Sequence, residues 1–150
     1  MNRMRALFIL MFISINAFAG AWSENSFGND DALDWVAECV DSKSAEIVSA
    51  TLISALNAKY IEAPQGAAAV AAAEVVAAAR GKANAAMPQE LNKWLALQSA
   101  PKLVELSPIA KKVLLKIRHK ESSELYQLWS ENGAEKWLAT VKDLEVRLGK

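Results

Sequence analysis

The sequence predicts an all-α fold, a compact bundle of about six to seven helices around an alanine-rich central helix. Residues 67–79 are all alanine apart from one glutamate and three valines. Elsewhere apolar residues recur at helical spacing, and no segment alternates in the manner of a strand. Slightly over half of the chain is apolar, 53%, which suffices for one core. Because alanine favours helix and adds almost no volume, neighbouring helices are expected to approach this helix closely.

The alanine-rich helix is expected over residues 62–80. Pro64 suits its first turn, because proline lacks the N–H that would be unpaired there. Gly81 suits the position just past its end. Helical spacing and capping residues predict six further helices, over residues 30–41, 44–60, 88–100, 108–120, 123–131 and 134–148. Asn29 or Asp30 is expected to cap the helix at 30–41, and Ser122 or Ser123 the helix at 123–131. In this scheme Tyr60 extends the buried line of the helix at 44–60, Pro101 ends the helix at 88–100, and Ser107 caps the helix at 108–120.

The first 19 residues have the pattern of a secretory signal peptide. Arg3 and Arg5 precede an apolar stretch at residues 6–15, and Ala17-Phe18-Ala19 forms a small-x-small cleavage site. A membrane anchor is the competing interpretation, but the apolar stretch is about half of the roughly 20 residues that a spanning helix needs. We therefore expect residues 20–150 to form a single helical domain, periplasmic or secreted from a bacterium, with no stable membrane anchor after cleavage.

Composition excludes several classes of function. The formal net charge is zero, so no overall field attracts nucleic acid. With one cysteine, Cys39, and one histidine, His119, neither a cysteine-based zinc cage nor a multi-histidine metal site is available, and no cofactor is expected. Cys39 itself is expected to be a buried small apolar residue, with an intermolecular disulfide as the alternative in an oxidising compartment.

Glu74 is the candidate buried carboxylate. Its helical neighbours three and four positions away are alanines and a valine, so no basic side chain on its own helix pairs with it. If the helix is buried all round, the carboxylate needs a donor from elsewhere. The lead segment contains Gly20, Trp22 and Phe27, which are expected to dock onto the bundle, and the Gly20 ammonium or the Trp22 indole N–H is the hypothetical donor. The alternative is a solvated glutamate at an exposed edge.

Two charged helix faces are candidate partner surfaces. The first predicted helix has an acidic face, opposite an apolar arc that includes Leu33 and Ala37. The helix at 108–120 has a basic face around His119, in which Leu115 is isolated among cations. A lone leucine there suggests docking, either to another helix of this domain or to a partner. Both faces have an ordinary interpretation as solvated helix surface, and a straight helix does not supply the converging ligands of a calcium site. The candidate residues are Asp31, Asp34, Glu38 and Asp41 on the acidic face, and Lys112, Leu115 and Lys116 on the basic face.

The chain from residue 20 to 148 resembles the uncharacterised bacterial family catalogued as domain of unknown function 4259. The resemblance is carried by the opening Gly20-Ala21-Trp22, by Phe27 followed by residues 29–36, by Glu62-Ala63-Pro64 and by the alanine-rich helix, and it continues at residues 88–95 and 123–129. It implies a small helical domain without an assigned activity. Members usually carry glycines and a proline between the tryptophan and the phenylalanine, and an acid before the Asn-Asp pair. This chain has Ser23, Asn25, Ser26 and Gly28 at those positions, so properties that depend on glycine backbone freedom in that loop are not carried over.

Two functions of different classes fit these observations. The first is a non-enzymatic exported module that binds a protein partner or is structural, for example by neutralising a toxin or enzyme. The second is a hydrolase or metal-dependent enzyme that uses Glu74 with Asp34 or Asp31 as paired carboxylates. A concave pocket that holds Glu74 beside a second titratable group would favour the enzyme. A filled centre with a charged convex surface would favour the binding module.

Overall fold

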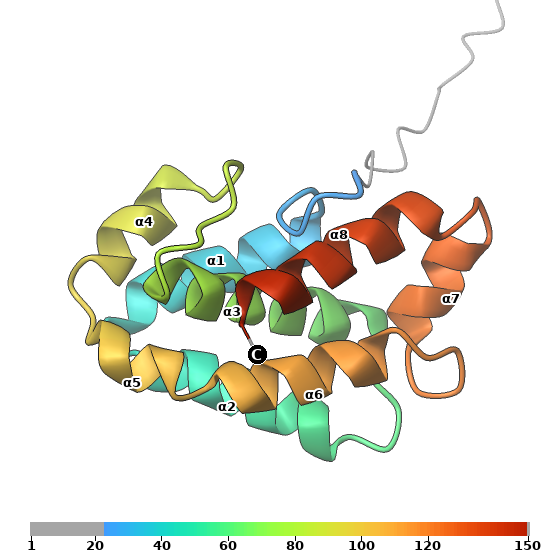
Figure 1. The fold of residues 1–150 in the computed structure, drawn as a ribbon, viewed down its shortest axis with the longest axis horizontal. Helices are drawn as coiled ribbons and strands as arrows, with labels where there is room; N and C mark the ends of the chain where they lie inside the picture. The colour runs from blue at the N-terminus through green and yellow to red at the C-terminus, as the bar shows by residue number, and fades with distance from the viewer. Residues whose placement is uncertain (1–22, 150) are drawn as a thin grey trace, which may run out of the picture.

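The computed structural model describes residues 23–149, which form eight helices and no strand (Figure 1). The all-α prediction is confirmed for this part of the chain, and the predicted number of six to seven helices is too low. The helices are α1 Asp30–Ser42, α2 Glu46–Asn57, α3 Ala63–Ala79, α4 Gln89–Leu95, α5 Ala100–Val104, α6 Ser107–Ile117, α7 Glu124–Ser130 and α8 Glu135–Arg147.

The additional helix is α5, which begins where the sequence predicted only an end. Pro101 lies in the first turn of α5, where proline needs no hydrogen-bond acceptor. The next boundary differs too, because Ser107 lies inside α6 and its hydroxyl donates to the Val104 carbonyl at 2.7 Å, so it is not a side-chain cap. Both residues therefore lie at helix boundaries, but Pro101 begins a helix instead of ending one, and Ser107 is not a cap.

The second helix is shorter than predicted because the residue after its predicted end, Ile61, pairs with another segment. It ends at Asn57, and Tyr60 is exposed rather than part of a buried line. The Ile61 N–H donates to the Ser122 carbonyl at 2.9 Å, and the Ile61 carbonyl accepts from the Glu124 N–H at 2.9 Å. This short parallel bridge requires extended backbone, which ends the helix before it reaches α3.

Several predicted helix ends are confirmed by their geometry. Asn29 caps α1, with its side-chain oxygen accepting from the Ala32 N–H at 2.9 Å. Ser123 caps α7 by accepting from the Tyr126 N–H at 3.2 Å. Gly81 follows α3 with a φ of 78°, a left-handed conformation that favours glycine. These local signals were readable because they depend on residues only a few positions apart.

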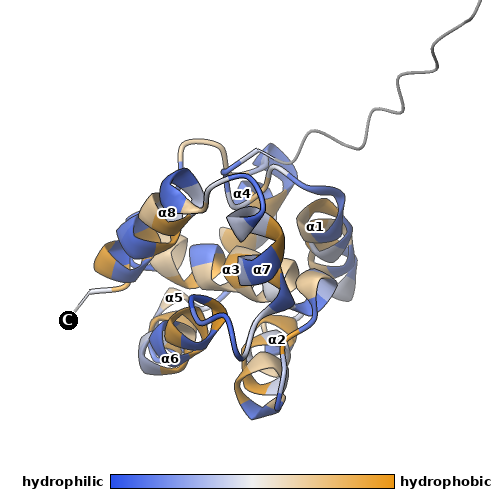
Figure 2. Ribbon diagram, turned by 90° about the vertical axis from the view of Figure 1, so that its right-hand side faces the viewer, coloured by the Kyte–Doolittle hydropathy of each residue, from blue (hydrophilic) through white to orange (hydrophobic). Residues whose placement is uncertain are grey.

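Helix α3 contacts six other helices, α1, α2, α5, α6, α7 and α8. Figure 2 shows α1 and α2 on one side of α3, and α8, α5 and α6 on the other. Ala71, Ala72 and Ala73 are fully buried among these neighbours. Small side chains here let helices pack from several directions at once, because each neighbour meets a surface close to the backbone.

The outward side of α1 differs from the prediction. Trp35, Val36 and Cys39 are buried, but Leu33 is 45% exposed and Ala37 is exposed as well. The predicted apolar arc was therefore too wide, because α1 lies at the edge of the bundle and meets neighbours over only part of its circumference.

The packing of α3 predicts a steep cost for added volume. Replacing the fully buried Ala72 by leucine should lower the free energy of unfolding by about 1–3 kcal/mol, because close-packed helices must move apart to accept it. Ala37→Leu, on the exposed side of α1, is the matched control and should change it by less than about 0.5 kcal/mol. Urea denaturation measures both. Equal effects of the two changes would contradict the close-packing argument.

Candidate functional site

The carboxylate of Glu74 is fully buried and has hydrogen-bond donors at both oxygens. Oε1 accepts from the Ser26 hydroxyl at 2.6 Å and from the Asn84 side-chain amide at 3.0 Å. Arg147 approaches with both terminal nitrogens, Nη1 donating to Oε2 at 2.6 Å and Nη2 to Oε1 at 2.9 Å. The negative charge of Glu74 is therefore balanced by a guanidinium that binds both carboxylate oxygens, which is the strongest kind of side-chain ion pair.

The network joins four separate segments of the chain. Glu74 comes from α3, Ser26 from the lead before α1, Asn84 from the loop after α3, and Arg147 from the last turn of α8. Arg147 also donates from Nη1 to the Lys82 carbonyl at 3.1 Å, so it contacts the same loop as well. One buried carboxylate thus fixes the lead, the loop and α8 relative to α3.

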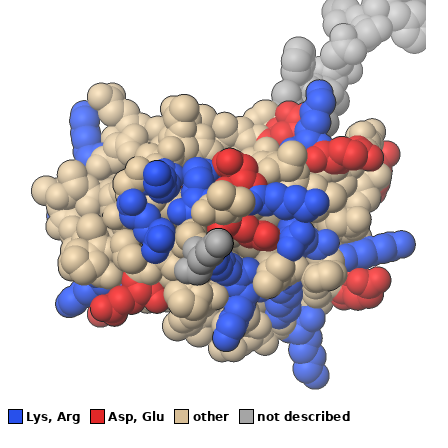
Figure 3. Space-filling model, in the orientation of Figure 1, with Lys and Arg blue, Asp and Glu red and all other residues tan. Residues whose placement is uncertain are grey.

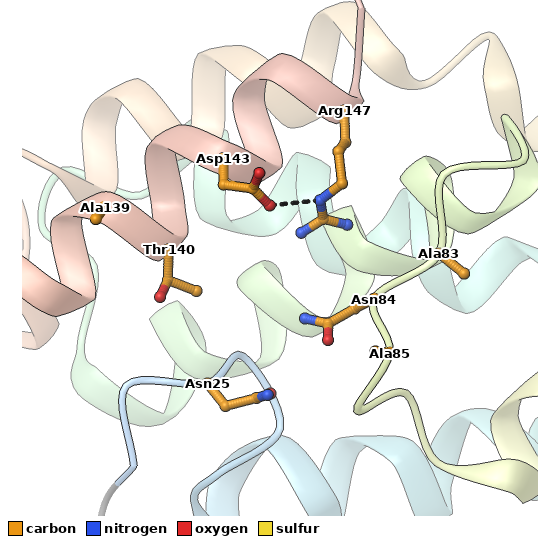
Figure 4. A pocket seen from close by; sticks show the side chains of 8 residues that line it. All are labelled: Asn25, Ala83, Asn84, Ala85, Ala139, Thr140, Asp143 and Arg147. Atoms are coloured by element: carbon orange, nitrogen blue, oxygen red, sulfur yellow. Dashed lines mark hydrogen bonds and ion pairs between the residues drawn. The ribbon is translucent and has the colours of Figure 1, made fainter.

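Arg147 has a second acidic partner on the surface. Its Nε donates to Asp143 at 2.7 Å, one turn earlier in α8 (Figure 4). The hydrogen bonds that Arg147 donates to Glu74 raise the pKa of Arg147 above its usual value, against the opposing effect of burial. The guanidinium therefore stays charged at any working pH.

Burial of Glu74 excludes the interpretation of a solvated glutamate at an exposed edge. The hypothetical donors Gly20 and Trp22 lie outside the described residues. Sequence reasoning missed Arg147, which is 73 positions away from Glu74. The one available signal was an arginine directly beside Leu148 and three positions after Leu144, both on the buried stripe of α8.

A pocket of about 530 Å³ lies beside this network. In Figure 4 the Asn84 and Arg147 side chains border it from one side and Asn25 and Thr140 from others. Glu74 itself is not part of the wall. Glu74 is fully buried and each of its oxygens accepts from a protein donor, so the carboxylate is not exposed to a molecule bound in the pocket. The lining residues are Asn25, Ala83, Asn84, Ala85, Ala139, Thr140, Asp143 and Arg147.

A second hollow lies between α6 and α8 and contains exposed apolar side chains. It has a volume of about 270 Å³ and is lined by Lys111, Leu115, Glu145 and Val146. Leu115 is 45% exposed and Val146 is 77% exposed. Glu145 is neutralised by an ion pair with Arg118 at 2.7 Å. We call these four lining residues the α6–α8 groove.

The predicted basic face divides into two parts in the structure. Lys112 and Leu115 are exposed. Lys116 turns inward, and its ammonium donates to the carbonyls of Ala55 at 3.3 Å, Leu56 at 2.9 Å and Ala58. These carbonyls end α2 and have no partners within the helix, so Lys116 acts as a long-range cap for them.

The surface formed by α6 and α8 carries many lysine and arginine side chains, with some acidic side chains among them (Figure 3). The predicted acidic face belongs to α1, where Asp34, Glu38 and Asp41 are exposed and Asp31 is half-buried. Because α1 and the pair α6 and α8 lie on opposite sides of α3 in Figure 2, the two charged faces do not neutralise each other within one chain.

The lead segment docks through the two central residues of a tight turn, which the Gly28 N–H closes by donating to the Asn25 carbonyl at 3.0 Å. Phe27 and Ser26 are both 6% exposed, so the predicted docking residue Phe27 is buried. Asn25 shapes the turn by accepting from the Phe27 N–H at 2.9 Å. The predicted docking residues Gly20 and Trp22 lie outside the described part of the chain.

The single cysteine and the single histidine lie apart from this network. Cys39 is a free thiol, fully buried in α1, and burial, with a smaller contribution from Glu38, raises its pKa to about 12. His119 is exposed just after α6.

Within residues 23–149 no group of three or more potential ligands is placed to hold a metal ion. No helix of this part of the chain has the length and apolar character to cross a membrane.

The buried ion pair predicts an asymmetric response to mutation. Glu74→Gln should lower the free energy of unfolding by about 3 kcal/mol, because it leaves a largely buried guanidinium without its counter-charge. Asp143→Asn removes the other acidic partner of Arg147. The Asp143 side chain is 65% exposed, so this change should lower the free energy of unfolding by less than about 1 kcal/mol.

A double-mutant cycle with Arg147→Met separates the pair from its surroundings. Glu74→Gln combined with Arg147→Met should cost less than the sum of the two single changes, because neither partner is then left charged and unpaired. Thermal or urea denaturation gives all four values. Additive effects would show that the two side chains do not depend on each other.

The comparisons with known proteins identify a family. Residues 20–140 match the model of a family described as Domain of unknown function (DUF4259). No curated protein and no solved structure matches the chain. Since the matched region covers most of the sequence, the chain belongs to the DUF4259 family.

Proposed function

We propose that this chain is an exported, non-enzymatic module that binds a protein partner through the α6–α8 groove, with the alanine-rich helix α3 as its central scaffold. The observation that carries the proposal is the exposure of Leu115 and Val146 in one hollow beside Lys111. Exposed aliphatic side chains rimmed by charge are typical of surfaces that bury them against a partner.

The cations around the groove indicate an acidic partner surface. Lys111 lines the groove, and Lys112 is exposed beside it on α6. Lys142 is exposed on α8, one turn before Val146. Such a rim steers an acidic surface toward the groove, while the apolar pair supplies the area that becomes buried. An amphipathic helix with an acidic border is the element that fits an apolar groove between two helices.

The alternative, an enzyme that uses Glu74 with Asp34 or Asp31, has less support. Glu74 is held by Arg147 and is absent from the wall of the neighbouring pocket. Asp34 and Asp31 belong to α1, which contributes no residue to that pocket. A carboxylate fixed in an ion pair is better suited to organising the fold than to exchanging protons with a substrate.

A designed probe tests the groove. A synthetic amphipathic helix with a leucine stripe bordered by glutamates should bind the purified chain, and fluorescence anisotropy gives its affinity. Leu115→Glu should weaken binding by about tenfold or more, because it places a charge where an apolar contact forms. Leu97→Glu is the matched control, since Leu97 is 84% exposed beyond α4 and outside the groove. Equal weakening by both changes, or no binding at all, would overturn the proposed surface.

Export makes a separate prediction. When the chain is expressed in a bacterium with its own leader, intact mass spectrometry of the periplasmic fraction should show a product that begins at Gly20. Leu10→Arg breaks the apolar stretch of the leader and should leave the full-length chain in the cytoplasm. Recovery of the wild-type chain at full length in the cytoplasm would contradict export.

A further inference from the structure

We propose that the occupant of the α6–α8 groove is helix α1 of a second copy of this chain, so that copies associate head to tail. The inference rests on the proposed function, since it names the partner of that groove. It follows from the distribution of charge and exposed aliphatic side chains over two opposite sides of the molecule.

The two halves of the described chain carry opposite charge. Residues 23–79 contain two basic and nine acidic residues, whereas residues 80–149 contain twelve basic and eight acidic residues. The boundary falls at the end of α3. Because α1 belongs to the first part and α6 and α8 to the second, this division along the chain becomes a division in space (Figure 2).

The outward stripe of α1 matches the groove in kind. At 100° per residue Leu33 and Ala37 lie within about 40° of each other, and Asp34 and Asp41 fall along one border of the stripe. All four residues are exposed. The stripe therefore presents a short aliphatic strip with an acidic border, which is the complement of an aliphatic groove with a basic border.

The groove supplies the matching groups at the same spacing. Lys111 and Leu115 are four positions apart on α6, and Lys142 and Val146 are four positions apart on α8. Each aliphatic residue thus has a lysine one turn away on the same face. Glu145 does not repel the incoming acids, because its charge is balanced by Arg118 at 2.7 Å.

The contact cannot close within one molecule, because α1 and the groove lie on opposite sides of α3 (Figure 2). Two different surfaces on one chain produce a heterologous, head-to-tail contact, which builds a ring or an open row of copies. The area involved is that of one short helix, so the contact is weak and depends strongly on ionic strength.

Sedimentation velocity on the purified chain tests this directly. At an ionic strength of about 0.01 M, where charges act over roughly 30 Å, the sedimentation coefficient should rise with concentration. At about 1 M, where the range is roughly 3 Å, it should fall to the monomer value. Leu115→Glu and the double variant Asp34→Lys/Asp41→Lys should each stay monomeric at low ionic strength. Ile53→Glu is the control, because Ile53 is 44% exposed on α2, outside both the groove and the α1 stripe, and this variant should associate like the wild type.

Mixing the two defective variants gives the sharpest readout. Leu115→Glu keeps its acidic α1, and Asp34→Lys/Asp41→Lys keeps its groove, so an equimolar mixture has one functional contact. It should form a one-to-one complex and nothing larger. Circular dichroism checks that each variant is folded, and Lys111→Glu is a second groove variant that should also be monomeric.

The second-copy assignment is overturned if the wild type is monomeric at low ionic strength, or if either variant associates like the wild type. It is also overturned if the mixture forms no complex. Binding of the designed acidic helix distinguishes failure of the proposed groove from failure of the second-copy assignment. If that probe binds through Leu115 while the chain stays monomeric, the groove is a binding surface for another protein and only the identity of the partner is wrong.

Discussion

The burial of one carboxylate constrains the rest of the structure. Removing a charged glutamate from water costs several kcal/mol unless it is paired and hydrogen-bonded. Glu74 is surrounded by small apolar side chains of its own helix, so its donors must come from elsewhere in the chain. Arg147, Ser26 and Asn84 supply them. Arrangements that misplace α8, the lead or the loop after α3 leave the charge without a partner.

The same constraint separates the interior from the functional surface. Glu74, the candidate catalytic carboxylate, is hydrogen-bonded to side chains that hold the fold together. Lys116, a candidate for the partner face, is engaged with the end of α2. Leu115, Val146 and Lys111 are left on the surface without such roles. Side chains that do not stabilise the fold through contacts of their own are available to a partner. For this reason the proposed function lies on α6 and α8.

The agreement between expectation and structure follows the range of each interaction. Capping by Asn29 and Ser123 and the left-handed Gly81 were predictable, because each depends on a few adjacent residues. Tyr60 was misplaced because a bridge to residues 122–124 ends α2 early. Leu33 was misplaced because periodicity shows that a helix has an apolar side but not how many neighbours cover it. Arg147 was missed because nothing local links it to Glu74.

The amino-acid sequence by itself determined the all-α class, most helix boundaries, the membership of an uncharacterised family and the isolation of Glu74 on its own helix. Only the tertiary structure decided that Arg147 pairs with Glu74, that Lys116 caps α2, and that the acidic and basic faces point away from each other. The physical reason is one of distance along the chain. Helix formation and capping depend on near neighbours, whereas charge pairing and exposure depend on which helices the packing of α3 brings together.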